Sequence, residues 1–373
     1  MIYFDNAATT AHKPQKVIAA VQNAIKNFSA NPGRGGHKAS LNAADAVFSV
    51  RDKVAEYFNA ESAENVVFTQ NCTLAVNIAM QGLFFPGDHI IISSLEHNAV
   101  YRTAMYLKKK GIDFSVAEVS LDEDTTVNNF LSLIRHNTKG IVCTHASNVF
   151  GIVLPIKRLG EICRTYGLKF IVDAAQTAGV LPIDMNVCNI DCLCIAPHKG
   201  LYSPMGTGIL ITDNSPAPLV FGGTGSNSID HNQPEFLPDK YESGTINVPG
   251  ICGIGAGIDF VKQNEGNAYK KELKLIRYIY SMLSKKDNVQ LYTPIPDNRF
   301  VPLLSFNIIG ENSESAAAKL NENNIAVRAG LHCAPLAHRS FGTIDIGTVR
   351  VSPSILNTEN EAEYIVHTVK KAF

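Results

Sequence analysis

The sequence predicts an α/β protein in which a mainly parallel, seven-stranded-type sheet forms a large domain and a smaller α/β domain follows it. Two observations predict this arrangement. From about residue 47 to 260, short apolar runs rich in β-branched residues alternate with amphipathic helical stretches. Such alternation is typical of buried parallel strands covered by helices on both faces. From about residue 262 the rhythm changes, which indicates a second unit.

The predicted strands of the large domain share apolar, β-branched character and short length. They are NVVFT (65–69), HIIISS (89–94), KGIVCTH (139–145), KFIVDAA (169–175), DCLCIA (191–196) and GTGILI (206–211). Helices are predicted between several of them, at 100–111 and at 155–167. The second of these begins with Pro155 and ends on Gly167, as helix-end preferences favour.

The C-terminal part shows a different order of elements. A long charged amphipathic helix is predicted over 264–285, followed by a strand at 301–309 and by helices at 313–325 and 357–373. We therefore expect a large domain at 1–261 and a small domain at 262–373. The start of the chain, to about residue 15, is expected to pack on the small domain.

Composition excludes several classes of function. The 373 residues are 45% hydrophobic and 18% charged, with a net charge of −1. These values are typical of a soluble globular protein and indicate neither a nucleic-acid nor a membrane partner. The first residues do not resemble a signal peptide, and no apolar run approaches the roughly 18 residues of a spanning helix. The cytoplasm is the expected compartment.

The eight cysteines raise the question of a metal site. Cys188, Cys192 and Cys194 lie close together, but no second closely spaced ligand pair accompanies them. Zinc sites usually combine two such pairs, and alternating cysteines in an apolar strand fit as small buried hydrophobes. No metal is predicted.

Polar residues follow the predicted strands almost at once. QNCT follows residue 69, LEHN follows 94 and PHKG follows 196, with similar clusters after the strands at 139–145 and 169–175. In open α/β sheets ligands bind beyond the carboxyl ends of the strands. Five successive clusters therefore predict one convergent site.

The chemistry of these clusters fits pyridoxal-5′-phosphate (PLP), which needs a lysine, an acid for the pyridine nitrogen, a phosphate cradle and a group against the ring. Lys199 is the candidate lysine, although a lysine after a strand is more often solvated. Asp173 ends an apolar strand and is the candidate acid; capping the following segment is the alternative.

Cys72 and Thr73 open a predicted helix, whose N-terminus could bind phosphate or be merely capped by Asn71. His97 could stack on the ring or lie at the surface.

The sequence also resembles a known family. The strings that carry the resemblance are YFDNAATT (3–10), NPGRGGHKAS (31–40), LEHNA (95–99), THASNVFG (144–151), VDAAQTAG (172–179), PHKG (197–200), YESGTINV (241–248), RAGLHCAP (328–335) and GTVRVS (347–352). In this order and spacing they resemble the class V aminotransferase group of fold-type I PLP enzymes. The match is closest to the branch of the cysteine desulfurases and selenocysteine lyases.

This resemblance implies roles around the cofactor. Lys199 would form the Schiff base, Asp173 would bind the pyridine nitrogen and Gln176 the ring hydroxyl. His97 would lie over the ring. The phosphate would be held by Thr73, by the neighbouring backbone at Cys72 and by His198.

It also implies roles toward the substrate and a second subunit. Asn148 would lie near the ring hydroxyl and the substrate carboxylate, and Arg350 would clamp that carboxylate, as a guanidinium fork can. Members of the family are homodimers, and Thr224 would reach the phosphate bound by the partner subunit.

Three positions depart from the family pattern. Ala196 stands where many relatives carry Ser or Thr, which removes one phosphate hydroxyl. Cys72 stands where many carry a threonine. Leu331 replaces a histidine beside the nucleophile, so that only His332 remains there for proton transfer.

Cys333 is the candidate nucleophile and lies in the predicted small domain. The later part of its segment shows neither a helical nor a strand periodicity, so we predict a loop there. Most free cysteines are buried and inert, but Arg328, His332 and His338 could favour a thiolate. The resemblance implies that Lys199 removes the Cα proton of L-cysteine and that Cys333 takes the sulfur as a persulfide, leaving alanine.

The short loop resembles the Suf-type branch, which implies sulfur transfer to an acceptor protein and a link to iron–sulfur cluster assembly. The alternatives are a selenocysteine lyase, a class V aminotransferase acting on a small amino acid, and a PLP-binding scaffold without turnover. Lys199, Asp173 and Arg350 are all present, which disfavours the scaffold.

Overall fold

The computed structural model describes residues 1–33, 35–213, 215–226 and 228–373. Arg34, which lies in the segment NPGRGGHKAS quoted above for the family resemblance, falls outside the described residues.

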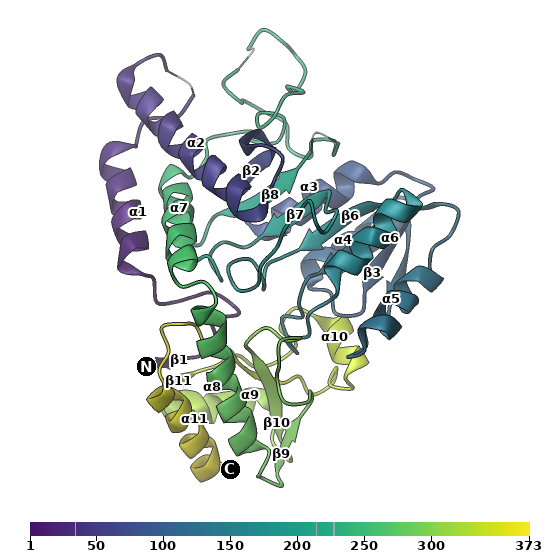
Figure 1. The fold of residues 1–373 in the computed structure, drawn as a ribbon, viewed down its shortest axis with the longest axis vertical. Coiled ribbons are helices and arrows are strands. Elements are labelled where there is room, and N and C mark those ends of the chain that lie inside the picture. The colour runs from purple at the N-terminus through teal and green to yellow at the C-terminus, as the bar shows by residue number, and fades with distance from the viewer. Residues whose placement is uncertain (34, 214, 227) are drawn as a thin grey trace.

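A seven-stranded sheet forms the centre of the upper body in Figure 1, with the strand order β2-β8-β7-β6-β5-β3-β4 among the described residues. Its strands are β2 (Val66–Thr69), β3 (His89–Ser93), β4 (Asp113–Ala117), β5 (Thr138–Thr144), β6 (Lys169–Asp173), β7 (Cys192–Ile195) and β8 (Gly208–Thr212). β8 is antiparallel to both of its neighbours, β2 and β7. The other pairings are parallel, so all the strands of this sheet except β8 run in one direction.

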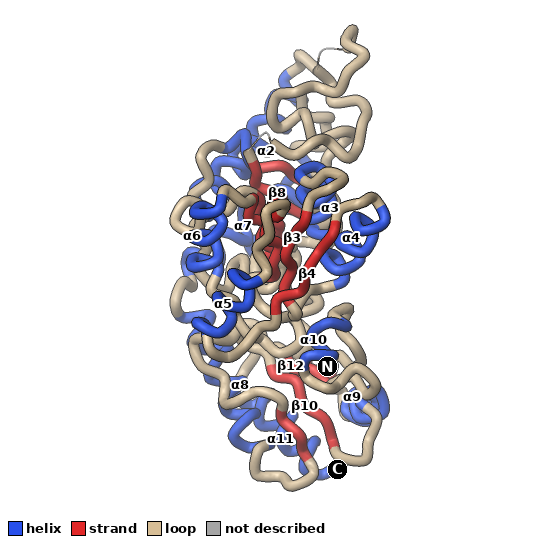
Figure 2. Tube along the Cα trace, turned by 90° about the vertical axis from the view of Figure 1, so that its right-hand side faces the viewer, coloured by secondary structure: helices blue, strands red, loops and turns tan. Residues whose placement is uncertain are grey.

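Helices cover both faces of this sheet. Figure 2 shows α5, α6 and α7 on one side of the strands and α3 and α4 on the other. The helices of this part are α1 (Gln15–Asn27), α2 (Lys38–Phe58), the short 3₁₀ helix η1 (Ala63–Asn65), α3 (Cys72–Leu83), α4 (Asn98–Lys109), α5 (Glu123–Ser132), α6 (Ile156–Tyr166) and α7 (Val248–Gln263).

The alternation of side chains along the strands divides the core in two. Ile91 packs into the cluster with α2, α6 and α7, whereas its neighbours Ile90 and Ile92 pack into the cluster with α3 and α4. Both faces are therefore dry, which is why these strands read as continuous apolar runs rather than as alternating ones.

A second, three-stranded antiparallel sheet lies in the lower body, in the order β12-β10-β9. The elements there are α8 (Asn267–Leu283), β9 (Val289–Leu291), β10 (Leu304–Ile308), α9 (Ser313–Glu322), β11 (Ile325–Ala326), α10 (Pro335–Ser340), β12 (Val349–Val351) and α11 (Glu359–Ala372). The first strand, β1 (Ile2–Tyr3), pairs with β11, and Phe4 lies in the apolar cluster of this body. The chain thus begins and ends in the lower body, as Figure 1 shows.

The predicted fold class is confirmed, and each predicted strand and helix has its counterpart within a few residues. The prediction of a loop throughout the segment after Cys333 is wrong in part, because α10 follows within two residues. This helix has only six residues, too few to show a periodicity, and it begins at Pro335.

Other elements carried no clear signal. The helix α7 contains four glycines, which lower helix propensity, and a Cβ at Gly257 would lie 1.9 Å from the carbonyl oxygen of Leu201. The domain boundary at 261/262 stays a prediction; it falls in the last turn of α7, just before α8. Among the described residues, no helix is long and apolar enough to cross a membrane.

Candidate functional site

Most of the predicted site residues line one cavity at the carboxyl edge of the large sheet. Its volume is about 210 Å³. Because β2, β3, β5, β6 and β7 run in one direction, the segments that follow them meet at the same edge. The predicted residues in its wall are Cys72, Thr73, His97, Asn148, Asp173, Gln176, His198, Lys199 and Arg350.

Lys199 lies in a tight turn four residues after the end of β7. Its N–H donates to the carbonyl of Ala196, and the hydroxyl of Thr10 donates to the carbonyl of Lys199. The next residue must be small, because a Cβ at Gly200 would lie 2.3 Å from the carbonyl oxygen of Ala178. Burial lowers the pKa of the Lys199 amine, although Asp173 acts in the opposite direction. The amine is therefore easier to deprotonate than a solvated lysine.

Asp173 is the last residue of β6 and is only 4% exposed. Its Oδ1 accepts from the backbone N–H of Ala175 at 2.9 Å and faces the thiol of Cys72 at 3.6 Å. The capping role that Asp173 could have is thus real, but it occupies only Oδ1. Among the described residues no hydrogen bond to its second carboxylate oxygen occurs, so that oxygen can accept from a donor in the cavity.

The helix α3 presents its N-terminus to the same cavity. The side chain of Asn71 caps it by accepting from the N–H of Leu74 at 2.9 Å. The N–H groups of Cys72 and Thr73 belong to the first turn, where a helix has no carbonyl partners of its own. Burial holds the pKa of the Cys72 thiol well above its usual value, and the neighbouring Asp173 raises it further. Cys72 is therefore a neutral thiol in a turn whose N–H groups could bind an anion.

Two histidines in the wall are held in defined orientations. His97 caps α4, and its Nδ1 accepts from the N–H of Ala99 at 3.0 Å, which leaves its proton on Nε2. His198 lies 3.1 Å from the hydroxyl of Thr9 through Nδ1. Burial lowers the pKa of His97, and it lowers that of His198 to about 4. Both rings are neutral at neutral pH.

Arg350 and Asn148 lie together on the side of the lower body. The guanidinium of Arg350 is 1% exposed; it donates from Nη1 to the carbonyl of Asn148 at 2.7 Å and from Nη2 to Asp5 at 2.8 Å. The Nε of Arg350 and the Oδ1 of Asn148 are buried without hydrogen-bond partners among the described residues. Such orphaned groups are rare in proteins, and here they line the cavity.

Gln176 is tied to the start of the chain. Its amide nitrogen donates to the carbonyl of Ala7 at 3.1 Å, which fixes the side chain against the cavity.

Cys333 lies in a neighbouring open groove of about 580 Å³ that shares His97 and Thr73 with the cavity. It is exposed, and its sulfur lies 3.7 Å from Nη2 of Arg328. Its carbonyl accepts from the N–H of Asn98, the first residue of α4, at 2.6 Å. The thiol is therefore open to solvent and lies beside a cation, a setting that suits a nucleophile.

Thr224 does not join the others within one chain. It lies in a separate cavity of about 220 Å³ with Ser226 and Asp239. Its hydroxyl is 3.0 Å from that of Ser226, which in turn contacts Asp239.

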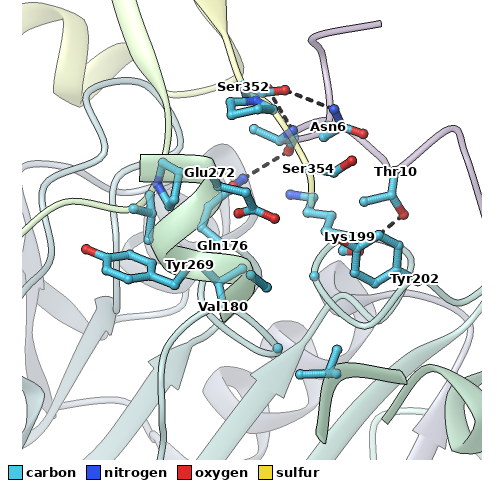
Figure 3. Close-up of a pocket in the computed structure, with 18 of the residues that line it drawn as sticks. Asn6, Thr10, Gln176, Val180, Lys199, Tyr202, Tyr269, Glu272, Ser352 and Ser354 are labelled. Atoms are coloured by element: carbon cyan, nitrogen blue, oxygen red, sulfur yellow. Dashed lines mark hydrogen bonds between the residues drawn. The ribbon is translucent and has the colours of Figure 1, made fainter. Parts of the chain in front are cut away.

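A smaller cavity of about 60 Å³ adjoins Lys199 and was not predicted (Figure 3). Asn6, Gln176 and Ser354 line it, and Glu272 of α8 extends its carboxyl group into it. Burial raises the pKa of Glu272 to about 8, so this group is a protonated acid at neutral pH. Sequence reasoning also missed Asp5, the partner of Arg350, because no local pattern links residues 345 positions apart.

The cysteine cluster behaves as a set of small hydrophobes. Cys192 and Cys194 are fully buried in β7, and Cys188 is 8% exposed. No group of ligands that could hold a metal occurs among the described residues.

Comparison with known proteins gives one consistent result. The family described as "Aminotransferase class-V" matches residues 2–365. A "Probable cysteine desulfurase" of Methanothermobacter thermautotrophicus is 32% identical, over 99% of this chain and 94% of the relative. A "Cysteine desulfurase" of Haloferax volcanii is 31% identical, over 100% of this chain and 89% of the relative.

Solved structures agree. The apo structure of a cysteine desulfurase from Thermococcus onnurineus NA1 superimposes with a TM-score of 0.92 at 29% identity, covering 100% of this chain and 94% of that chain. The cysteine desulfurase CsdA of Escherichia coli, in an S-sulfonic acid form, superimposes with a TM-score of 0.87 at 26% identity, covering 99% and 94%.

Proposed function

Because this chain belongs to the class-V aminotransferase family, within its cysteine desulfurase branch, we propose that it is a PLP-dependent cysteine desulfurase. The enzyme converts L-cysteine to L-alanine and receives the sulfur on Cys333. One observation carries the proposal: Lys199, Asp173 and Arg350 line a single cavity, and Cys333 lies in the groove that adjoins it.

The residues of the cavity fit PLP. An amine, a carboxylate with a free oxygen and a helix N-terminus match the aldehyde, the pyridine nitrogen and the phosphate of that cofactor. The Nε of Arg350 and the Oδ1 of Asn148 have no hydrogen-bond partners among the described residues, which supports a polar ligand beside them.

We assign the cofactor contacts accordingly. Lys199 would hold PLP covalently, and Asp173 would bind its ring nitrogen through the free oxygen. Gln176 would bind the ring hydroxyl and His97 would cover the ring face. The phosphate would be bound by Cys72, Thr73 and His198, and by Thr224 of a second copy of the chain.

The bound cofactor supplies an electron sink for the pair released when the Cα–H bond breaks. Arg350 binds the substrate carboxylate, with Asn148 beside it, and this contact orients the Cα–H bond. The lowered pKa of Lys199 lets its Nζ accept the Cα proton. The thiolate of Cys333 attacks the substrate sulfur; a sulfur–sulfur bond forms and the Cβ–sulfur bond breaks. The electron pair stays on the carbon fragment, which takes up one proton at Cβ, regains one at Cα from Lys199 and leaves as alanine.

A homodimer is part of this proposal. The long segment between β8 and α7 projects from the upper body in Figure 1 and carries Thr224. Phe221 and Ile229 on the same segment are 70% and 92% exposed. Apolar residues so exposed favour a covering partner, and a second copy would bring Thr224 to the phosphate. The exposure of Cys333 supports transfer of its sulfur to an acceptor protein.

The test begins with the absorbance of the purified protein, for which a band near ~420 nm is expected when PLP is bound through Lys199. A protein in which added PLP produces no such band would contradict the cofactor assignment. The second step is an assay of sulfide and alanine formation from L-cysteine by Cys333→Ala. A Cys252→Ala variant of the half-buried cysteine on α7 serves as the control.

We expect Cys333→Ala to lose sulfide formation and Cys252→Ala to retain it. Unchanged desulfuration by Cys333→Ala would remove the nucleophile from the proposal. Alanine formation by that variant from L-selenocysteine alone would indicate a selenocysteine lyase, and a keto acid formed without sulfide would indicate an aminotransferase.

A further inference from the structure

The segment that carries Cys333 is an excursion of the chain whose two ends are joined. The backbones of Arg328 and Arg350 exchange hydrogen bonds of 3.3 and 2.8 Å, and the N–H of Thr348 donates to the carbonyl of Gly330 at 3.1 Å. The two strands touch so closely that a Cβ at Gly347 would lie 2.7 Å from Cα of Gly330. The excursion that carries Cys333 thus spans residues 330–347.

The turn that bears Cys333 has an unfavourable backbone. His332 and Cys333 have φ angles of 51° and 57°, in the left-handed region that residues with a Cβ rarely adopt. Two consecutive residues keep this conformation only where the surroundings hold them. Asn148 donates to the carbonyl of His332 at 2.7 Å and Asn98 to that of Cys333 at 2.6 Å, so both carbonyls are anchored on the large-domain side.

The side chain of His332 is held from the other direction. Its Nδ1 lies 3.5 Å from Nε2 of His338, and Nδ1 of His338 lies 2.7 Å from the hydroxyl of Thr343. The two imidazoles stack at 9° with their centroids 5.7 Å apart. Nε2 of His332 lies 3.4 Å from the carbonyl of Arg328.

The carbonyl at the end of this chain sets the position of each proton. A carbonyl only accepts, so Nε2 of His332 must donate and its Nδ1 must accept. Nε2 of His338 is therefore the donor to His332. Nδ1 of His338 accepts from the hydroxyl of Thr343 at 2.7 Å, the shorter of two contacts of that hydroxyl, since the carbonyl of His338 lies 3.4 Å from it. The protons run one way: Thr343 to His338, His338 to His332, His332 to the carbonyl of Arg328.

The surroundings keep both rings uncharged. His332 is 3% exposed and His338 is fully buried, with the ring of Phe150 5.8 Å from that of His338. The guanidinium groups of Arg350 and Arg328 further disfavour a charge on His332. Burial lowers the pKa of His332 to about 2 and that of His338 to about 4.

We propose that Thr343, His338 and His332 form a one-way chain of hydrogen bonds that holds the turn bearing Cys333 in its reactive position. His332 is then a positioning residue and does not transfer a proton in the reaction, since both of its nitrogens already have hydrogen-bond partners. The inference rests on the proposed role of Cys333.

The first test removes single hydroxyl groups. Thr343→Val breaks the chain without changing side-chain volume, and Thr343→Ser keeps the hydroxyl. Thr348→Val is the matched control, because the hydroxyl of Thr348 is buried in the same segment without a partner among the described residues. In the holoenzyme we expect kcat for desulfuration to fall about tenfold in Thr343→Val, as a misplaced reacting group implies.

The KM for L-cysteine and the cofactor absorbance should stay as in the wild type, because Arg350 and Lys199 keep their contacts. Thr343→Ser should recover most of kcat, and Thr348→Val should match the wild type. Equal kcat for Thr343→Val and the wild type, or equal losses in Thr343→Val and Thr348→Val, would overturn the proposal.

The second test does not depend on turnover. The rate at which iodoacetamide alkylates Cys333 at pH 7, followed on the peptide by mass spectrometry, should fall about threefold or more in Thr343→Val, because the sulfur leaves the guanidinium of Arg328. An unchanged rate would contradict the positioning role. This result remains interpretable if Cys333→Ala retains desulfuration, an outcome that would refute the proposed function but not the positioning of the thiol.

The third test observes the protons directly. In protein labelled with ¹⁵N-histidine, the ring nitrogens of His332 and His338, assigned from His332→Gln and His338→Gln, should report neutral rings protonated at Nε2 at pH 7. A charged imidazole or an Nδ1–H form at either residue would overturn the one-way chain.

Discussion

Arg350 donates from Nη2 to Oδ1 of Asp5 across 2.8 Å, joining the first residues of the chain to β12. The arginine is almost fully buried, at 1% exposed, and the side chain of Asp5 is 20% exposed. Asp5 is the only carboxylate that forms an ion pair with this guanidinium among the described residues. The pair therefore lets a charged arginine remain in a dry site.

Asp5→Ala is expected to reduce the free energy of unfolding by about 3 kcal/mol, because it leaves a buried charge without its partner. Urea denaturation of both proteins measures this difference. Lys274→Ala is the control: it breaks an exposed pair, between Lys274 and Glu359 at 2.6 Å, with side chains 70% and 65% exposed. Its effect should stay below about 1 kcal/mol. Equal losses in the two variants would show that the Asp5 pair is no more than a surface contact.

Glu272 predicts a pH dependence of stability. Its pKa is raised by burial from 4.5 to about 8 in the folded protein, so the folded state binds the proton more tightly than the unfolded state. This contribution is complete below pH 4.5 and is lost as the pH rises toward 8. Relative to Glu272→Gln, which cannot titrate, the wild type should lose up to about 1.4 kcal/mol per pH unit in that window. Unfolding measured at pH 5, 6.5 and 8 tests it; parallel curves would mean that Glu272 is already ionised.

Gly160 of α6 predicts a steric effect. A Cβ there would lie 1.8 Å from the carbonyl oxygen of Cys188. This oxygen belongs to the backbone, which cannot move aside at low cost. Gly160→Ala should lower stability by about 3 kcal/mol. Gly266→Ala is the control, since it has φ of 72° but open space around it, and should cost about 1 kcal/mol. Thermal unfolding compares the two, and a smaller loss at Gly160 would contradict the close approach.

The cysteines should differ sharply in reactivity. Cys333 is exposed, whereas Cys143 and Cys194 are fully buried, and burial raises the pKa of Cys192 to about 12. Because the thiolate is the reactive form, iodoacetamide at pH 8 should label Cys333 first in the folded protein. The fast phase should disappear in Cys333→Ala, and all eight thiols should react in urea. Fast labelling of a β7 cysteine in the folded protein would contradict its burial.

The local patterns of the sequence predicted most elements of the fold. Apolar β-branched runs predicted the buried strands of the large sheet, because a strand covered on both faces needs apolar side chains at every position. They did not reveal β4, an edge strand that is only partly buried, nor α7, whose glycines lower helix propensity while permitting close packing. An apolar run therefore predicts a strand only where the strand is buried on both faces.

For the candidate site, the sequence by itself determined which residues follow the strands, and hence that Lys199, Asp173 and His97 would meet at one edge. Only the tertiary structure decided the contacts made across the chain: Asp5 with Arg350, and the anchors of the Cys333 turn on Asn98 and Asn148. The physical reason is that hydrophobic periodicity is local, whereas a hydrogen bond between remote residues depends on the packing of every element between them.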